Sequence, residues 1–321
     1  MAQDSLITVE HLSRRYGEQV AVNDLSFSVA RGEVLGFLGP NGAGKSTTMQ
    51  MLTGNLAPGT GRITINGIDL LEQPREAKRH LGYLPEQPPL YRDLTVDEYL
   101  RLCARLHHIP RSHLGAAVDD AKGRCGLGEV GRRLIGHLSK GYQQRVGIAQ
   151  AIIHNPAVVI LDEPTVGLDP IQIREIRHLV RELGGEHSVI LSTHILPEVQ
   201  ATCDRVQIIQ RGQLVLSDSI AGIRQRMRGG SLLLGLQHPP GEAALLAIPG
   251  VQGVETLEPQ RLRIRYDSEA STAQGPAEAL AQAAVEQGWG LFELSPEQRS
   301  LEEIFVDLTT RDDAPQPGEA A

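Results

Sequence analysis

The apolar residues of roughly the first two thirds of the chain follow two patterns. From residue 6 to residue 29 they alternate with polar residues in short bursts, which is typical of strands in an antiparallel layer. Other apolar runs are continuous, which indicates strands buried on both faces of a sheet. These runs occupy residues 34–38, 158–161 and 189–191. Together the patterns predict an α/β fold with a mixed sheet at its core and an antiparallel β layer beside it.

Turn signals separate four further short strands. Asn66-Gly67 and Arg211-Gly212 are both typical of tight turns between strands. The expected strands are a segment that contains Ile63 and Ile65, then 81–84, 206–209 and 214–216. The first of them extends the antiparallel layer, and the last two form a closing hairpin.

A helical region interrupts the strands between about residues 95 and 151. Thr95, followed three residues later by Glu98, predicts a capping box at the start of its first helix. The residues expected to share the buried face of that helix recur at helical spacing. They are Tyr99, Leu102 and Leu106. We interpret the region as a helical insert within the first domain.

Arg228-Gly229-Gly230 marks a domain boundary, because two glycines separate a helical segment from a new alternating pattern. The predicted domains are 1–228 and 229–311, and the polar tail 312–321 is expected to be disordered. The elements expected after the boundary are strand 231–237, helix 241–248, strands 251–257 and 261–266, helix 276–287, strand 291–295 and a final helix near 300–310. This order predicts a small ferredoxin-like α+β domain.

Composition limits the partners of the chain. Its 321 residues carry a formal net charge of −8, so nucleic acid is not an expected partner. Three widely spaced cysteines without a CxxC pair argue against a disulfide framework and a zinc site, and they fit a reducing cytosol. No apolar run approaches the roughly 18 residues of a membrane span. A partner must therefore anchor this protein if it works at a membrane.

A glycine-rich loop lies between the apolar run 34–38 and a predicted helix at 45–52. Two glycines separated by four residues, then lysine and a hydroxyl residue, match the phosphate-loop pattern. In such a loop Lys45 reaches the β- and γ-phosphates of a nucleotide and Ser46 ligates Mg²⁺, while backbone N–H groups face the anion. The loop is Gly39, Pro40, Asn41, Gly42, Ala43, Gly44, Lys45, Ser46 and Thr47. Its strand and helix neighbours disfavour the alternative of a simple tight turn.

Two acids follow the buried strand 158–161, at the end where parallel strands present their functional side chains. Asp162 is a candidate contact of Mg²⁺. Glu163 is the candidate general base that orients or deprotonates the attacking water. A solvated turn is the commoner interpretation of Asp-Glu-Pro alone, but the apolar strand and the phosphate loop favour the catalytic one.

Leu138–Arg145 supplies a second anion site, because Ser139 and Gly141 stand at the start of a predicted helix. Together with Asp162-Glu163, this segment resembles the signature region of ATP-binding cassette (ABC) ATPases, which typically contains Leu-Ser-Gly-Gly-Gln. The resemblance extends from residue 6 to about residue 220. It implies a P-loop NTPase domain of the ABC type, with ATP as substrate and Mg²⁺ as cofactor.

The resemblance also implies the roles of residues that are weak signals alone. Tyr16 matches the aromatic residue that stacks on adenine. His194 matches the switch histidine that contacts the γ-phosphate. Asp169 ends the segment Val166–Asp169, which matches the loop that crosses the dimer interface. We therefore expect these residues to belong to the nucleotide site.

In this family the signature helix does not reach the phosphate loop of its own chain, so two cassettes meet head to tail. A homodimer, or a pair with another cassette, is therefore implied. Ser139, Lys140 and Gly141 of one chain are expected to complete the site of the other. ATP then closes the dimer and hydrolysis reopens it, which makes the pair a two-state switch.

Three residues depart from the family pattern. Glu86 stands where most cassettes carry the glutamine that links Mg²⁺ to the transport domain, with Gln87 just after it. A carboxylate also binds a hard cation, so Glu86 is a candidate metal ligand, and whether Glu86 or Gln87 takes the role stays open. Lys140 and Tyr142 replace a signature glycine and glutamine. Because a lysine opposes the dipole at a helix N-terminus, we expect Lys140 to approach the ATP phosphates of the partner, or else to face solvent.

Sequence variants narrow the resemblance to the ATPase subunits of bacterial ABC-2 type exporters, particularly the gliding-motility-associated group. The variants are residues 82–86, 138–142 and 193–199, and Leu301–Phe305 is similar to the end of drug- and polysaccharide-export cassettes. This implies a separate membrane permease and a location on the cytoplasmic face of the inner membrane. Pro88–Tyr91 and the helical insert are the expected docking surface.

Two alternatives stay open. A soluble ABC-type ATPase switch acting on ribosomes or DNA is one, although such relatives usually carry two cassettes or a long coiled coil and this sequence shows neither. The second domain is either a regulatory sensor or a dimer brace. We favour the brace, because this domain has no cysteine, histidine cluster or charge patch.

Overall fold

The computed structural model describes residues 5–266 and 274–298. The chain forms two compact units, Met1–Ile220 and Ala221–Ala321. Several sequence predictions lie outside the described residues: the final helix near 300–310, the Leu301–Phe305 segment and the disordered tail 312–321. The predicted boundary after residue 228 stays a prediction. At that point helix α8 (Ile220–Met227) is followed directly by strand β11 (Arg228–Leu236).

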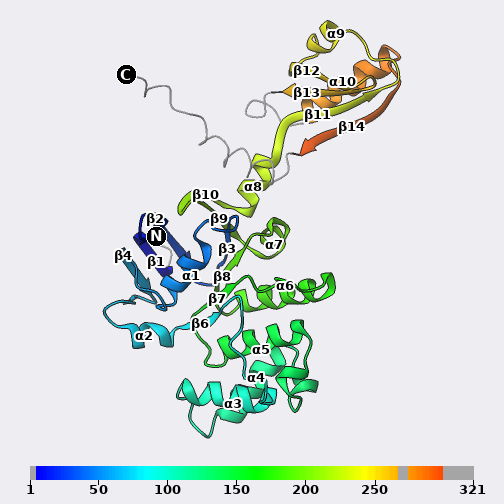
Figure 1. The fold of residues 1–321 in the computed structure, drawn as a ribbon. Helices are drawn as coiled ribbons and strands as arrows, with labels where there is room; N and C mark the ends of the chain where they lie inside the picture. Colours follow the sequence, from blue (N-terminus) through cyan, green and yellow to red (C-terminus); the bar gives the residue numbers. More distant parts are fainter. Residues whose placement is uncertain (1–4, 267–273, 299–321) are drawn as a thin grey trace, which may run out of the picture. The chain divides into compact units, whose positions relative to one another are not determined.

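The predicted antiparallel layer is present in the first unit (Figure 1, blue). Its strand order is β2-β1-β4-β5, formed by Ser5–Tyr16 (β1), Gln19–Ala30 (β2), Thr60–Ile65 (β4) and Ile68–Asp69 (β5). Apolar residues pair across β1 and β2, as Val9 does with Phe27 and Leu12 with Leu25, and all four are buried. The period-two alternation therefore turns one face of the layer toward the core.

The core sheet has the strand order β10-β9-β3-β8-β7-β6. Neighbouring strands from β9 to β6 run parallel, and only β10 pairs antiparallel, as the predicted closing hairpin requires. The strands are Val34–Leu38 (β3), Leu81–Leu84 (β6), Val158–Asp162 (β7), Ser188–Thr193 (β8), Arg205–Gln210 (β9) and Gln213–Ser219 (β10). All residues of β3, β7 and β8 are buried, so the continuous apolar runs are confirmed as central strands.

Four helices of the first unit follow strands or loops of these sheets. They are Lys45–Leu52 (α1), Pro74–Arg79 (α2), Pro170–Gly184 (α6) and Leu196–Thr202 (α7). Because β3, β7 and β8 are parallel neighbours, the segments that follow them emerge at the same edge of the sheet (Figure 1).

The helical insert contains α3 (Val96–Leu106), α4 (Leu114–Arg124) and α5 (Lys140–Ile152), with single 3₁₀ turns at Gly128–Val130 (η1) and Ile135–His137 (η2). The capping box is confirmed: the Glu98 backbone N–H donates to Thr95 Oγ1, and the Thr95 N–H donates to the Glu98 carboxylate.

The predicted buried face of α3 was wrong in part. Tyr99 is buried, but Leu106 is 69% exposed, and the other buried residues are Val96, Leu100, Cys103 and Ala104. At about 100° per residue this face is centred near Val96, and Leu106 lies roughly 90° to one side of it. Leucine spacing alone therefore pointed to the wrong face.

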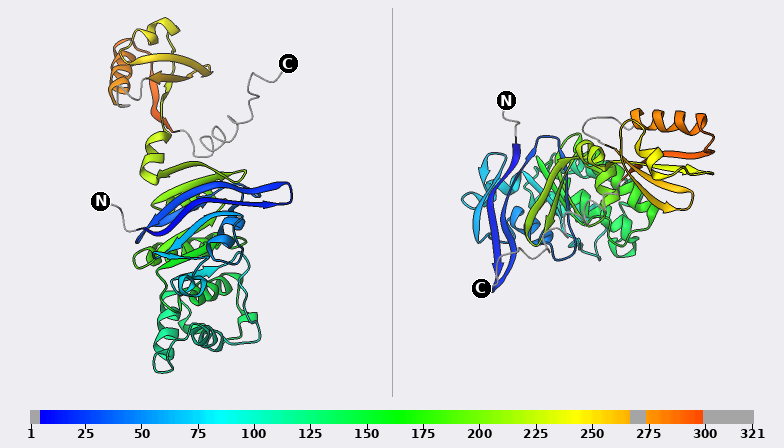
Figure 2. Two further views of the ribbon diagram at one scale, coloured as in Figure 1. Left: turned by 90° about the vertical axis from the view of Figure 1, so that its left-hand side faces the viewer. Right: turned by 90° about the horizontal axis from the view of Figure 1, so that it is seen from above.

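The second unit follows the ferredoxin-like plan. Its order is β11, α9 (Glu242–Leu246), β12 (Val251–Glu258), β13 (Arg261–Tyr266), α10 (Gln274–Glu286) and β14 (Leu291–Gln298). The four strands form an antiparallel sheet in the order β12-β13-β11-β14. Leu232 and Ile264 of the sheet pack with Leu280 of α10, which covers one face (Figure 2, orange). The predicted strand and helix order is confirmed as far as the structure describes it.

Of the helices in the described residues, none combines the length and the apolar character that a membrane crossing requires.

Candidate functional site

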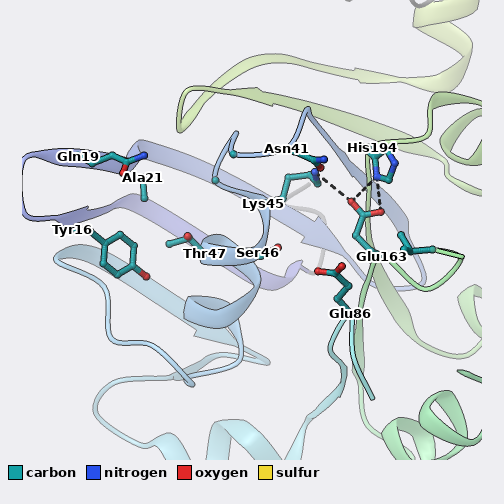
Figure 3. A pocket seen from close by; sticks show the side chains of 13 residues that line it. Tyr16, Gln19, Ala21, Asn41, Lys45, Ser46, Thr47, Glu86, Glu163 and His194 are labelled. Atoms are coloured by element: carbon teal, nitrogen blue, oxygen red, sulfur yellow. Dashed lines mark hydrogen bonds and ion pairs between the residues drawn. The ribbon is translucent and has the colours of Figure 1, made fainter. Parts of the chain in front are cut away.

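The candidate site lies where the phosphate loop, the end of β7 and the end of β8 meet. Figure 3 shows Lys45 and His194 on either side of Glu163, with Glu86 approaching from a separate loop. Residues distant in the sequence converge here because the parallel strands that carry them are neighbours in the core sheet.

The phosphate loop has a backbone that only glycine adopts without strain at two positions. Gly42 and Gly44 have φ angles of 81° and 105°, and a Cβ atom on Gly44 would overlap the Ala21 carbonyl oxygen. Helix α1 begins at Lys45, directly after Gly44, so its first N–H groups face the loop rather than a preceding helical turn. The loop and the helix start together form an anion cradle.

Lys45 is buried within this cradle. Its side chain is 6% exposed, and its Nζ donates to the carbonyl oxygens of Gly39 and Pro40 at 2.8 and 3.3 Å. The same Nζ lies 3.4 Å from Glu163 Oε1. The ammonium group is therefore fixed by three oxygens at the head of α1.

Glu163 joins Lys45 to His194. Its carboxylate accepts from His194 Nδ1 at 3.0 and 3.1 Å, and its backbone N–H donates to the Ser192 carbonyl at 2.9 Å. Since an ionised carboxylate can only accept, Nδ1 carries a hydrogen in this contact. The φ angle of Glu163 is 49°, a region that residues other than glycine rarely adopt. The surrounding contacts thus hold this acid in a strained conformation.

Asp162 lies beside Glu163 but is buried differently. It is 3% exposed, and its Oδ1 has no hydrogen-bond partner among the described residues. Burial raises the pKa of Asp162, and the charges of Glu163 and Glu86 add to this effect. A buried oxygen without a partner is costly unless a ligand satisfies it. The oxygens of Asp162, Ser46 and Glu86 form a donor set that suits a hard cation such as Mg²⁺.

A cleft of about 420 Å³ opens over these groups. It is lined by Tyr16, Gln19, Ala21, Asn41, Gly42, Gly44, Lys45, Ser46, Thr47, Glu86, Glu163, Val166 and His194. Four of the residues predicted around the phosphate loop and the metal do not line the cleft. They are Gly39, Pro40, Ala43 and Asp162. Glu86 lines the cleft and Gln87 does not.

The hairpin between β1 and β2 forms the far end of the cleft (Figure 3). Tyr16 is 47% exposed there, and the Arg14 guanidinium lies 5.2 Å from the centre of its ring. Sequence reasoning missed Gln19 and Ala21. Their signal was present, because the tight turn after Tyr16 pairs Gln19 directly opposite it.

The structure does not bring the signature residues to this cleft. Ser139 caps α5 by accepting from the Tyr142 N–H at 3.3 Å, and both Ser139 and Lys140 are exposed. Gly141 is buried, and a Cβ atom there would lie 2.6 Å from the Gln172 side chain. The Lys140 side chain instead covers Gly167, where an added Cβ would overlap its Nζ.

Asp169 likewise acts within its own chain. Its side chain accepts from the N–H groups of Ile171 and Gln172 at 3.0 and 2.9 Å and so caps α6. The cap fixes the segment between Glu163 and α6.

Comparison with known proteins gives this site its context. The family model described as ABC transporter matches residues 22–166. The linearmycin resistance ATP-binding protein LnrL of Bacillus subtilis (strain 168) is 30% identical over 95% of this chain and 99% of its own length. The chain belongs to the ATP-binding subunits of ABC transporters. The bacitracin transport ATP-binding protein BcrA of Bacillus licheniformis is 34% identical over 95% of this chain and 97% of its own.

Solved structures agree with this assignment. An ATP-binding subunit of an ABC transporter has 34% identity and a TM-score of 0.63, and the match covers 69% of this chain and 93% of that one. A dimeric ABC transporter cassette, MJ0796, has 23% identity and a TM-score of 0.61, with 67% and 98% covered, and shows the shared fold. The chain is thus an ABC ATPase. The relatives LnrL and BcrA extend over both units, whereas these structures match a part about the size of the first.

Proposed function

We propose that the cleft binds ATP with Mg²⁺ and that Glu163 catalyses hydrolysis of the γ-phosphate. The observation that carries this proposal is the contact of Glu163 with both Lys45 and His194 at the head of the phosphate loop. An ammonium group, a carboxylate and an imidazole are in contact in this cluster, which supports their assignment as phosphate cation, base for the water and second phosphate contact.

The lining assigns the parts of the nucleotide. The phosphate loop and Lys45 bind the phosphates, and Tyr16, exposed at the far end, stacks on adenine. Ser46, Asp162 and Glu86 would hold Mg²⁺, which would neutralise phosphate charge. Glu86 rather than Gln87 takes the metal-facing role, because only Glu86 lines the cleft.

Lys45 lies beside Glu163, with its ammonium group 3.4 Å from the Glu163 carboxylate. A γ-phosphate that Lys45 binds therefore lies next to the candidate base. Glu163 then takes a proton from the attacking water, while His194 keeps the carboxylate oriented and contacts the γ-phosphate.

A second cassette completes the site. Ser139, Lys140 and Gly141 lie outside the cleft of their own chain, at a helix N-terminus where Ser139 and Lys140 are exposed and which is suited to an anion. We assign them to the ATP held by the partner in a head-to-tail homodimer or cassette pair. ATP binding closes the dimer, and hydrolysis reopens it.

The chain works on the cytoplasmic face of the inner membrane, as the ATP-binding subunit of an exporter with a separate integral membrane permease. Support comes from the relatives, which are named for linearmycin resistance and bacitracin transport. The insert and the segment Pro88–Tyr91, with Tyr91 60% exposed, provide the docking surface. These relatives favour transport over a switch on ribosomes or DNA. The second unit, which they share, serves as a dimer brace.

Glu163→Gln tests the catalytic assignment. The amide keeps the hydrogen-bonding shape but accepts no proton, so we expect ATP binding within about threefold of wild type and turnover at least about 100-fold lower. ATP should shift this variant to a dimer in size-exclusion chromatography with light scattering. The exposed Glu129→Gln is the matched control and should behave as wild type. Near-normal hydrolysis by Glu163→Gln would remove Glu163 as the base.

Affinity purification from membranes tests the transport assignment. The expected result is one integral membrane protein that co-purifies in a nucleotide-sensitive manner. Recovery of ribosomes or DNA instead would favour the alternative switch.

A further inference from the structure

Behind the catalytic cluster lies a second buried carboxylate that the proposed chemistry does not use. Glu198, on α7, is 1% exposed, although glutamate is rarely fully buried without partners. Its Oε2 accepts from Thr193 Oγ1 at 3.0 Å, and Thr193 is itself fully buried. A carboxyl group buried this deeply requires polar partners. The partners of Glu198 connect it to His194.

The Thr193 hydroxyl makes two hydrogen bonds that bear on the backbone next to His194. It donates to Glu198 and accepts from the backbone N–H of Ile195 at 3.0 Å. These two bonds determine the backbone at Thr193 and Ile195, the neighbours of His194 in the chain. The His194 ring, in turn, contacts Glu163. The conformation of the histidine therefore depends on the position of the Glu198 carboxylate.

Glu198 is also joined to α6. Arg177, on α6, places a guanidinium nitrogen 3.8 Å from Glu198 Oε1, which is an ion pair longer than a hydrogen bond. Arg177 Nε and Glu198 Oε1 both lack a hydrogen-bond partner among the described residues. The two side chains are thus too far apart for a hydrogen bond, although the Glu198 carboxylate is buried. A small movement of α6 toward α7 would let the Arg177 guanidinium donate to Glu198 Oε1.

Helix α6 is directly connected to the candidate base. The segment from Glu163 to the Asp169 cap leads into α6, whose Arg177 contacts Glu198. Glu198 holds Thr193, and His194 returns to Glu163. These contacts therefore connect α6 and α7 to the cleft, in a series that begins and ends at Glu163.

We propose that Arg177 and Glu198 are positioning residues, which hold His194 against Glu163 and make its position depend on α6. This inference rests on the proposed function, because it assigns His194 and Glu163 to hydrolysis. When the partner cassette moves the Asp169 segment, α6 tightens the Arg177–Glu198 pair and orders His194 for turnover. Neither residue touches the nucleotide.

Steady-state kinetics of the full chain provide the first test. Glu198→Gln and Arg177→Met should each lower kcat about tenfold and leave KM for ATP within about twofold, since positioning acts on the reaction and not on binding. The double variant should be no slower than the slower single one, because the two residues act as a unit. Arg177→Lys keeps the charge and should recover most of the activity. Arg181→Met removes an exposed arginine of the same helix and should have no effect.

Proton–nitrogen spectra of protein labelled at histidine provide the second test. The His194 signal, assigned with His194→Ala, should show the Nδ1–H tautomer in wild type and in Arg181→Met. In Glu198→Gln and Arg177→Met it should shift or broaden. An unchanged His194 signal in both variants, or unchanged kcat, would overturn the positioning role. Absence of ATPase activity in wild type, or full activity of Glu163→Gln, would contradict the proposed function instead.

Discussion

The two halves of the proposed nucleotide site differ in how far this chain alone builds them. On the phosphate-loop side, Lys45 and Glu163 are each 6% exposed and are held by several contacts. On the signature side, Ser139 and Lys140 are exposed at the start of α5 and do not line the cleft. One half is preorganised within the fold, and the other is a surface.

This difference follows from the elements that carry each half. Parallel strands fix the ends of β3, β7 and β8 at one sheet edge, and an active-site cluster there is rigid before ATP arrives. A helix N-terminus offers donors to an anion without enclosing it. In the proposed function, this division makes catalysis depend on a second cassette, so that assembly of the dimer controls turnover.

Lys45→Met should produce the largest effect, because it damages the preorganised half. It removes the phosphate cation and leaves the buried Glu163 carboxylate without its ion pair. We expect ATP affinity and turnover each to fall at least about 100-fold, measured by a fluorescent ATP analogue and by phosphate release. The exposed Arg75→Met is the control. ATP affinity within threefold of wild type would show that the cradle binds phosphate without its lysine.

Mixing two inactive variants should reveal the divided site directly. Lys45→Met chains keep an intact signature surface, and Ser139→Arg chains keep an intact phosphate loop. A head-to-tail mixed dimer therefore contains one complete site, and an equimolar mixture should regain about a quarter of wild-type ATPase activity. Each variant alone serves as its own control. A mixture as inactive as its components would contradict completion of the site by a partner.

Local sequence patterns predicted the residues of the phosphate-loop side, but not all of the residues that surround them. Strand, loop and acid positions follow from local patterns, so the phosphate loop and the Asp162-Glu163 pair were found before the fold was known. Gln19 was missed although the turn after Tyr16 pairs it with that residue, and Val166 enters the cleft through loop geometry, which local patterns do not contain. The burial of Glu198 depends on packing between α6 and α7. For the same reason the buried face of α3 was misassigned at Leu106, since helical spacing does not show which neighbours cover it.

Acid should loosen the far end of the helix that carries the signature surface. His154, just after α5, stacks on His107 with 3.7 Å between ring centres, and its Nε2 contacts the Leu81 carbonyl at 3.2 Å. Burial, with the neighbouring His107, lowers the pKa of His154 from 6.5 to about 4. The unfolded chain therefore binds the proton first as the pH falls from 6.5 toward 4, and stability decreases through that window.

The loss attributable to His154 should approach about 3 kcal/mol at the lower end of that window. Urea unfolding at pH 7 and pH 4, followed by far-UV circular dichroism, measures it. His154→Gln keeps a donor for Leu81 and should flatten the pH dependence, whereas the exposed His113→Gln should not. Equal pH dependence in wild type and His154→Gln would show that other groups titrate on unfolding.

Lys140→Ala should produce the smallest effect, and it tests the role of the signature side of the proposed site. A lysine in the first turn of α5 opposes the helix dipole, so its removal should stabilise an isolated chain by about 0.3–1 kcal/mol, visible as a small rise in Tm. In the ATP-bound dimer the same lysine is expected near the partner's phosphates. There its loss should weaken ATP affinity modestly and reduce the dependence of that affinity on salt. If ATP affinity and its salt dependence both stay unchanged, Lys140 serves only to cover Gly167 of its own chain.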